Sequence, residues 1–334
     1  MTTTPRPLTR RRAVVAAGFV SMIVAVALTP LMGSTSLDFE RVFNRSLPFA
    51  DNLDAQIFFL ARLPRALAAA MVGGTLAAAG VVFQGLLQNP LATPYTLGVS
   101  AGASLGAMVA ITFGATLPFV GVTGASLSGA ALAVFIVYAL AQARQRGLST
   151  TVLLLAGVTL NAFFSALILF VQYLSDFAQT FRAIRWLMGD LDVAGYDSML
   201  AATPFVIAAL ASFAWLARPL DLLTLGADAA TSRGVNVAVT QRVAFFGASL
   251  ATGAAVSVGG PIGFIGIIVP HLVRLVVGAD HRLVLPAATF FGATFLVLCD
   301  TLARTVLAPI ELPVGIVTAM IGGPFFLWML MRRQ

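Results

Sequence analysis

Polar side chains are rare in the long apolar stretches of this chain, and two groups of them are spaced to share one face of a helix. At 100° per residue, offsets of 0, 11, 15 and 22 keep four side chains within about 60° of one another. These four are Thr150, Asn161, Ser165 and Gln172. The second group, at offsets of 0, 4, 7 and 11, is Glu311, Gly315, Thr318 and Gly322. Polar groups are costly in hydrocarbon, so these rows indicate either a water-filled route or hydrogen bonds between packed helices.

Residue types that carry covalent or metal chemistry are scarce. All 20 basic residues are arginines, so the chain has no lysine for a P-loop or a Schiff base. The single cysteine, Cys299, cannot form an internal disulfide, and His271 and His281 do not form an HExxH motif. We expect His281 and the neighbouring Asp280 to be solvated rather than to bind a metal. No catalytic or metal site is predicted, and any ATP chemistry must come from a separate chain.

One charged island, residues 217–242, interrupts the apolar sequence: ARPLDLLTLGADAATSRGVNVAVTQR. Asp228 is placed to cap a short helix over Ala229–Arg233, and Gly234 suits its C-terminal end. Local chemistry alone favours a solvated connector. A rigid helix that passes motion into the membrane is the alternative.

The elements that must position these residues are membrane spans. The chain of 334 residues is 59% hydrophobic and only 10% charged, whereas soluble domains are about 25% charged. Apolar runs long enough to cross about 30 Å of hydrocarbon occur at ten places. These are 13–33, 64–87, 91–114, 117–141, 149–174, 197–217, 242–260, 261–279, 283–308 and 312–331. The expected fold is therefore all-α and polytopic, with a tail at 1–12 and one transmembrane domain over 13–334.

Arginine counts set the orientation of these spans. With the N-terminus inside, the loops on the cytoplasmic side hold thirteen arginines and those on the other side hold seven. The positive-inside rule therefore places both termini and the island 217–242 in the cytoplasm. The first apolar run resembles a secretory signal, but no A-x-A pattern follows it and its length suits a retained span.

Two local features carry expectations of their own. Pro270, inside a short apolar helix, should free a backbone carbonyl that must find another partner. Asp300 is expected to pair with Arg304 one helical turn later.

At this point the sequence resembles the permease subunits of type II ABC importers for iron–siderophores, haem and cobalamin. The similar stretches run in order along most of the chain. They are RLPR at 62–65, NPLATPYTLGVSAGAS at 89–104, LSTTVLLLAG at 148–157, GPIGFIGIIVPHLVRL at 260–275, DHR at 280–282 and ELPVGIVTAMIGGPFF at 311–326.

The resemblance implies roles for particular positions. The fifth and tenth spans would line a translocation path at a homodimer interface, with a cytoplasmic gate at Thr150 and Thr151. Three arginines would dock a periplasmic substrate-binding protein: Arg62, Arg65 and Arg304. The island would couple to the ATPase, and the residues implied are Leu225, Gly226, Asp228, Ala229, Arg233 and Gly234.

The implied protein is a non-catalytic, multi-pass permease of the bacterial inner membrane, working as a homodimer with two ABC ATPase subunits. It would bind no cofactor of its own, because Mg-ATP would sit on the partner, and no nucleic acid. The expected cargo is an iron–siderophore chelate, with cobalamin or haem as alternatives. A different class, an ion-coupled secondary transporter, would need carboxylates inside the membrane, and only Asp300 and Glu311 come close.

Overall fold

The computed structural model describes residues 8–33, 35–44, 46–114, 121–142, 150–192 and 195–331. Every regular element among these residues is helical, as the apolar composition predicts. In a helix the backbone N–H and C=O groups bond to one another, so they need no partner from hydrocarbon, which cannot form hydrogen bonds.

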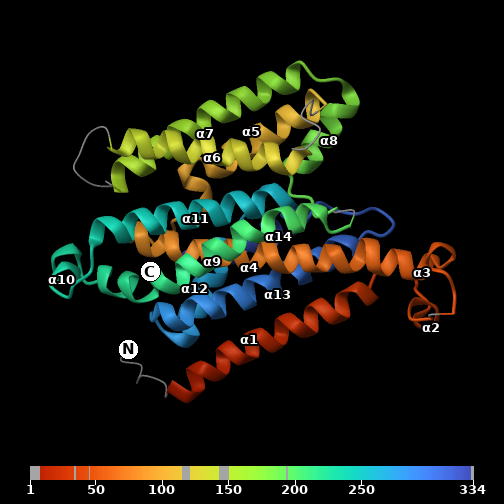
Figure 1. The fold of residues 1–334 in the computed structure, drawn as a ribbon, viewed down its shortest axis with the longest axis horizontal. Helices are drawn as coiled ribbons and strands as arrows, with labels where there is room; N and C mark the ends of the chain where they lie inside the picture. Colours follow the sequence, from red (N-terminus) through yellow and green to blue (C-terminus); the bar gives the residue numbers. More distant parts are fainter. Residues whose placement is uncertain are drawn as a thin grey trace.

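Ten helices form the body of the molecule (Figure 1). They are α1 (Leu8–Leu28), α4 (Leu63–Leu87), α5 (Val99–Thr112), α6 (Gly121–Gln142), α7 (Thr150–Tyr173), α9 (Asp197–Leu223), α11 (Val237–Gly259), α12 (Ile265–Val277), α13 (His281–Thr305) and α14 (Val314–Met331). Shorter elements connect them: η1 (Thr29–Leu31), α2 (Phe39–Val42), η2 (Phe49–Asp51), α3 (Leu53–Gln56), η3 (Ile57–Arg62), η4 (Pro94–Leu97), α8 (Phe177–Leu187) and α10 (Ala227–Thr231).

The helices form layers around a buried centre (Figure 1). Helix α4 packs along α13 and α11, and its residues are almost all buried. Helices α5, α6 and α7 pack on one another as an upper layer, and α1 packs on α13 at the opposite side. The core is built largely of alanine and small residues, which let helix backbones approach closely in lipid.

Glycine makes two of these contacts possible. A Cβ added at Gly73 of α4 would lie 2.3 Å from the carbonyl oxygen of Gly292 in α13. A Cβ at Gly102 of α5 would lie 2.5 Å from the carbonyl oxygen of Gly129 in α6. No side chain larger than hydrogen fits at these crossings.

Seven helices meet the length and composition needed to cross a membrane, and three apolar helices are shorter: α5, α12 and α14. These ten coincide with the ten predicted apolar runs, but ten crossings stay a prediction because the short three fall below the length criterion. Helix α1 begins at Leu8, before the predicted boundary between tail and span. Residues 1–7 lie outside the described part of the chain.

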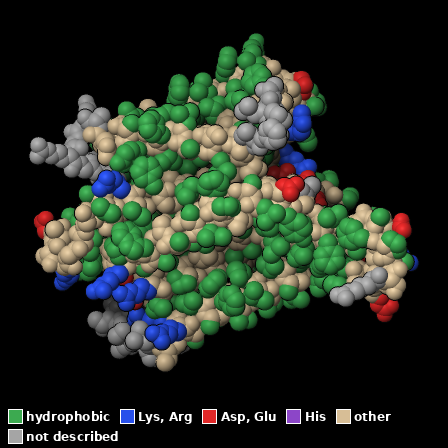
Figure 2. Space-filling view, in the orientation of Figure 1, with side chains coloured by type: hydrophobic (Ala, Val, Ile, Leu, Met, Phe, Trp, Pro, Cys, Tyr) green, Lys and Arg blue, Asp and Glu red, His purple; other side chains and the backbone are tan. Residues whose placement is uncertain are grey.

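The two ends of the bundle differ in charge. Helix α1 begins, and α14 ends, at the end of the molecule that carries α10 (Figure 1). On the face shown in Figure 2, arginine side chains gather mostly toward that end and acidic side chains mostly toward the other. This distribution of charge is the one that the predicted orientation requires. The orientation itself stays a prediction.

Among the described residues, the longest helix that was not predicted is α8. Helix α8 follows α7 after Asp176, whose side chain accepts a hydrogen bond from the backbone of Gln179 in a capping box. It is amphipathic, with Phe177 and Phe181 exposed and Ala183 buried. Arg182 and Arg185 lie one helical turn apart in α8 and interrupt the apolar run, so the hydropathy pattern does not predict a span here.

Candidate functional site

Helix α10 forms an exposed hairpin between α9 and α11, at the end where α1 begins and α14 ends (Figure 1). Ala230 anchors it with a fully buried side chain, while Leu225, Asp228 and Arg233 are exposed. All six residues predicted for ATPase coupling therefore lie on one protruding unit. This unit exposes one leucine and two side chains of opposite charge to solvent.

The predicted cap of this helix was wrong. The helix is Ala227–Thr231, its N-cap is Gly226, and Asp228 lies inside the first turn without a capping hydrogen bond. Gly226 adopts φ +100°, a conformation that glycine reaches without strain. The helix also ends at Thr231, two residues before the predicted end at Arg233. Gly234 lies in the turn that follows, with φ +82°, and Val235 N–H donates to the carbonyl of Ala230.

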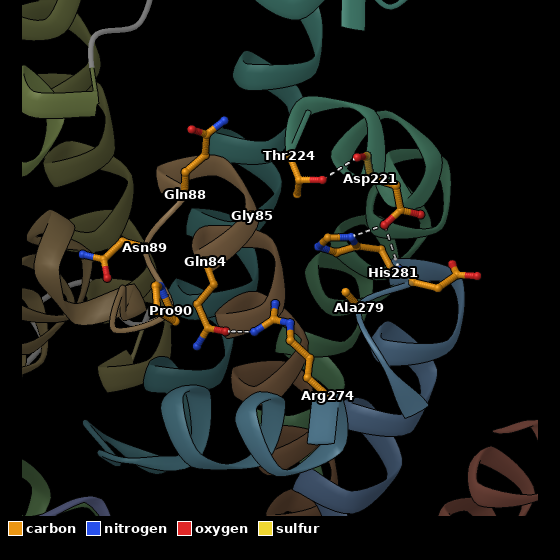
Figure 3. Close-up of a pocket in the computed structure, with 11 residues that line it drawn as sticks. Gln84, Gly85, Gln88, Asn89, Pro90, Asp221, Thr224, Arg274, Ala279 and His281 are labelled. Carbon is orange, nitrogen blue, oxygen red and sulfur yellow. Dashed lines mark hydrogen bonds and ion pairs between the residues drawn. The ribbon is translucent and has the colours of Figure 1, made fainter. Parts of the chain in front are cut away.

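A buried histidine joins the base of this hairpin to α13. Oδ1 of Asp221, at the end of α9, accepts hydrogen bonds from the backbone N–H of His281 at 3.0 Å and from its Nδ1 at 2.5 Å (Figure 3). His281 is 3% exposed, so the expectation that it is solvated was wrong. Asp221 and His281 are 60 residues apart, and no local sequence pattern links them.

A second pair lies beside the first (Figure 3). Nε2 of Gln84 donates to the carbonyl of Gly266 at 3.1 Å, and its Oε1 accepts from Arg274. Gly266 precedes Pro270 by four residues, so this is the carbonyl that the proline deprives of its helical partner. The expectation that it must find another partner is confirmed.

These two pairs line a pocket of about 540 Å³ between the ends of α4, α9 and α12 and the start of α13. Gln88, Asn89 and Thr224 add further polar groups at its edge (Figure 3). Side chains that hydrogen-bond between helices therefore line this pocket, near the base of the hairpin.

At the opposite end, an ion-pair cluster connects α4, α13 and the segment before α14. Nε of Arg65 lies 2.9 Å from Oδ1 of Asp300, and its Nη1 lies 2.6 Å from Oε2 of Glu311. Nε of Arg304 lies 3.1 Å from Oδ2 of Asp300, which confirms the predicted pair. Asp300 is 1% exposed. Asp300 is thus shared by two guanidinium groups, and Glu311 supplies the second negative charge of the cluster.

The three arginines predicted to dock a binding protein are all buried. Arg65 and Arg304 hold Asp300, and Arg62 donates to the backbone carbonyls of Pro30 and Thr35. In this structure their guanidinium groups serve internal contacts, and docking would require them to exchange these partners. Their role in docking stays a prediction.

The polar row of α7 faces α5 and η4. Asn161, Ser165 and Gln172 line a cavity of about 550 Å³, and Nδ2 of Asn161 donates to the carbonyl of Tyr95 at 2.9 Å. At the start of α7, Thr151 is exposed, and the side chain of Thr150 lies outside the described part of the structure.

Tyr95 is a residue that the sequence did not single out. Its hydroxyl donates to the carbonyl of Ile262 and accepts from the N–H of Ile262 at 3.0 Å, which ties η4 to the segment before α12.

The row on α14 faces other neighbours. A Cβ at Gly315 would lie 2.1 Å from the carbonyl oxygen of Met188, and one at Gly322 would lie 2.5 Å from the ring of Phe264. Thr318 is fully buried and donates to Gly315. Within one chain the two rows therefore do not face each other, since α14 packs on α12 and α13 while α7 packs on α5 and α6.

Among the described residues, no group of three or more His, Cys, Asp or Glu side chains is arranged to hold a metal ion. The single cysteine, Cys299, is buried. The structural features that stand out are therefore contacts between helices and the exposed hairpin.

Comparison with known proteins relates this chain to a protein family. The FecCD transport family matches residues 21–332. The hemin transport system permease protein HmuU of Yersinia pestis is 39% identical over 94% of this chain and 94% of that protein. The cobalamin import system permease protein BtuC of Halobacterium salinarum is 43% identical over 82% of this chain and 73% of that protein.

A solved structure has the same fold. It is described as an inward-facing conformation of a metal-chelate type ABC transporter, with a TM-score of 0.84 and 31% sequence identity. The alignment covers 96% of this chain and 99% of that one. The family match spans most of the chain, and the fold agrees over nearly its whole length. The chain belongs to the FecCD transport family.

Proposed function

We propose that this chain is the permease subunit of an ABC importer that carries a metal chelate across the bacterial inner membrane. The family, the metal-chelate type neighbour and the apolar helices all support this function. The first candidate cargo is an iron–siderophore complex, which the resemblance favours. Haem and cobalamin are the alternatives, and the two permeases compared above are named for hemin and cobalamin.

The observation that carries the proposal is the hairpin of α10 with its internal connection. Its exposed Leu225, Asp228 and Arg233 offer a docking surface, and Asp221 at its base is bonded to the first residue of α13. Force applied to α10 would therefore reach α13, a helix that contacts α4, α12 and α14. A channel or passive pore has no need for such a device.

The proposed assembly contains two copies of this chain, two ATPase subunits that bind Mg-ATP, and a periplasmic binding protein. Motion of α10 would open and close the path near Thr150 and Thr151. In each copy, the path would be bordered by the polar face of α7, with Asn161, Ser165 and Gln172, and by α14 of the homodimer interface.

The ion contacts favour this mechanism over an ion-coupled transporter. Asp300 and Glu311, the two candidate carboxylates, are already held by Arg65 and Arg304. A carboxylate that carries an ion or proton must be released in each cycle, and Asp300 is held by two arginines with almost no access to water.

The proposal is tested by reconstituting the permease in vesicles with its ATPase and binding protein. We expect uptake of one chelate class to require ATP and both partners, when a ferric siderophore, haem and cobalamin are compared at equal concentration. A vesicle holding the permease alone, under a proton or sodium gradient, is the control. Uptake by the lone permease would overturn the ABC mechanism. ATP-dependent uptake of haem or cobalamin but not siderophore would correct only the cargo.

A further inference from the structure

A hollow of about 630 Å³ opens between α6, α9 and α11, and none of the functional contacts described above uses it. Its floor consists of small residues, among them Ala208 and Ala209 of α9 and Gly247 of α11. A Cβ at Gly247 would lie 2.4 Å from Oγ of Ser212, so α9 and α11 are in close contact beneath the hollow. The space therefore arises from missing side chains rather than from separated helices.

The surroundings of this hollow are apolar. Ile207 and Trp215 of α9 and Phe246 of α11 expose 62%, 54% and 42% of their surface. The ring of Phe246 lies 4.8 Å from that of Tyr138, which forms a wall from α6. On helices long and apolar enough to cross a membrane, exposed apolar side chains such as these are available to lipid acyl chains.

One end of the hollow is polar and positively charged. Arg242 lies there, exposed, about one turn from the start of α11 and next to the hairpin of α10. Its Nε donates to the carbonyl of Ala238 at 3.2 Å, and no carboxylate among the described residues forms an ion pair with it. The hydroxyl of Tyr138, which accepts from Nε2 of Gln142, also lies toward this end of α6.

We propose that this hollow binds an anionic phospholipid, with an acyl chain between α6, α9 and α11 and the phosphate on Arg242. The occupant must be apolar along the small-residue floor and anionic at the end nearest α10, and a phospholipid of the cytoplasmic leaflet has both properties. Basic side chains between transmembrane helices at this level attract anionic headgroups, each worth about fivefold in binding. Tyrosine suits the same interfacial level.

The site would couple lipid composition to the hairpin, because Arg242 is on the helix that α10 leads into. The inference needs the membrane location of the chain and its predicted orientation, but no transport activity. Its failure would leave the transport function untouched, and failure of the transport function would leave the lipid site standing.

The experiment uses the purified full chain after removal of lipid. Phosphatidylglycerol and phosphatidylcholine with the same acyl chains are titrated, and bound lipid is counted by native mass spectrometry alongside the thermal unfolding midpoint. We expect tighter binding of phosphatidylglycerol, and Arg242→Gln should weaken it about fivefold. The same variant should weaken phosphatidylcholine less, because the choline ammonium offsets the charge of its phosphate. The matched control is Arg218→Gln, an exposed arginine of α9 outside the hollow, which should have no effect.

Filling the hollow tests the acyl-chain part. Ala208→Trp should abolish this binding of both lipids, whereas Ala211→Trp, exposed on the same helix but outside the hollow, should not. Equal loss in both arginine variants, or full binding by Ala208→Trp, would overturn the proposal. Stabilisation by inorganic phosphate alone would show an anion site without a lipid. A change of oligomeric mass in Ala208→Trp would show that a second copy occupies the hollow.

Discussion

At the scale of single residues, three buried polar contacts connect helices that are far apart in the chain. Asp300 is shared by two arginines, Gln84 repairs the carbonyl freed by Pro270, and Asp221 fixes both the backbone and the ring of His281. A buried polar group without a partner costs about 1 to 3 kcal/mol. These contacts therefore fix the positions of neighbouring helix ends relative to one another.

Replacing the central acid of the outer cluster should be severe. Asp300→Asn leaves two buried guanidinium groups without their shared charge, and we expect a loss of about 3 to 5 kcal/mol of stability. The unfolding midpoint in detergent measures it. Asp197→Asn, at an exposed position on α9, is the control and should change little. Equal midpoints for the two variants would show that the cluster is not stabilising.

The role of Gln84 can be isolated by a double-mutant cycle. Gln84→Leu removes the partner of Gly266 and of Arg274, so about 1 to 3 kcal/mol should be lost. In a Pro270→Ala background the backbone N–H of residue 270 returns to the Gly266 carbonyl, so the same change should cost less. Strict additivity of the two unfolding free energies would contradict the proposed repair.

At the scale of elements, the position of a helix depends less on its hydrophobic pattern than on two kinds of contact. These are the close approach of two helix backbones and the contacts between helix ends. Helix α4 is buried around most of its circumference, so its position is set by which neighbours can touch it. The glycines at its crossing with α13 allow the closest approach. The hairpin of α10, by contrast, has few neighbours and depends on its base.

The α4–α13 crossing predicts a specific glycine effect. Gly73→Ala must move the two helices apart, because its Cβ would meet the Gly292 carbonyl at 2.3 Å, and we expect a loss of about 1 to 3 kcal/mol. Gly323→Ala in α14, where the added Cβ would lie 3.9 Å from the ring of Phe264, should be neutral or slightly stabilising. Thermal unfolding of both variants checks the comparison.

The base of the hairpin should affect coupling rather than assembly. Asp221→Asn keeps an acceptor for His281 but removes the charge, so the ATPase should still bind while its stimulation by cargo-loaded binding protein falls several-fold. Asp280→Asn is the matched control. Asp280 is the N-cap of α13, where it accepts a hydrogen bond from the backbone N–H of Arg282. None of the described hydrogen bonds joins it to α9. Unchanged stimulation in Asp221→Asn would mean that force reaches α13 by another route.

At the scale of the whole molecule, one chain does not enclose a path between the polar rows of α7 and α14. Large apolar side chains remain exposed on both helices, including Leu155 of α7 and Met320 of α14. A second copy could cover them and bring the rows together around a central route, which is why we propose a homodimer.

Cross-linking tests the dimer. The native cysteine, Cys299, is 2% exposed and should give little background. Cysteine at Met320 should form a cross-linked dimer of twice the 34.8 kDa chain mass under mild oxidation, whereas cysteine at Val20, exposed on α1, should not. Monomer mass in native spectrometry, together with no cross-link at any exposed α14 position, would rule out this interface.

The sequence by itself determined the all-helical class, the positions of the apolar helices, the exposed island and the Asp300–Arg304 pair. Each of these follows from neighbours within a few turns, where hydropathy, charge and glycine act locally. Local chemistry was insufficient for the cap of α10, because Gly226 took the position expected of Asp228.

Only the tertiary structure decided which distant residues meet. It brought Asp221 to His281, Gln84 to the carbonyl freed by Pro270, and Arg65 to both Asp300 and Glu311. It also turned the rows of α7 and α14 toward different neighbours. A helix pattern fixes which side chains share a face, but the partner of that face depends on close packing between helices far apart in the chain.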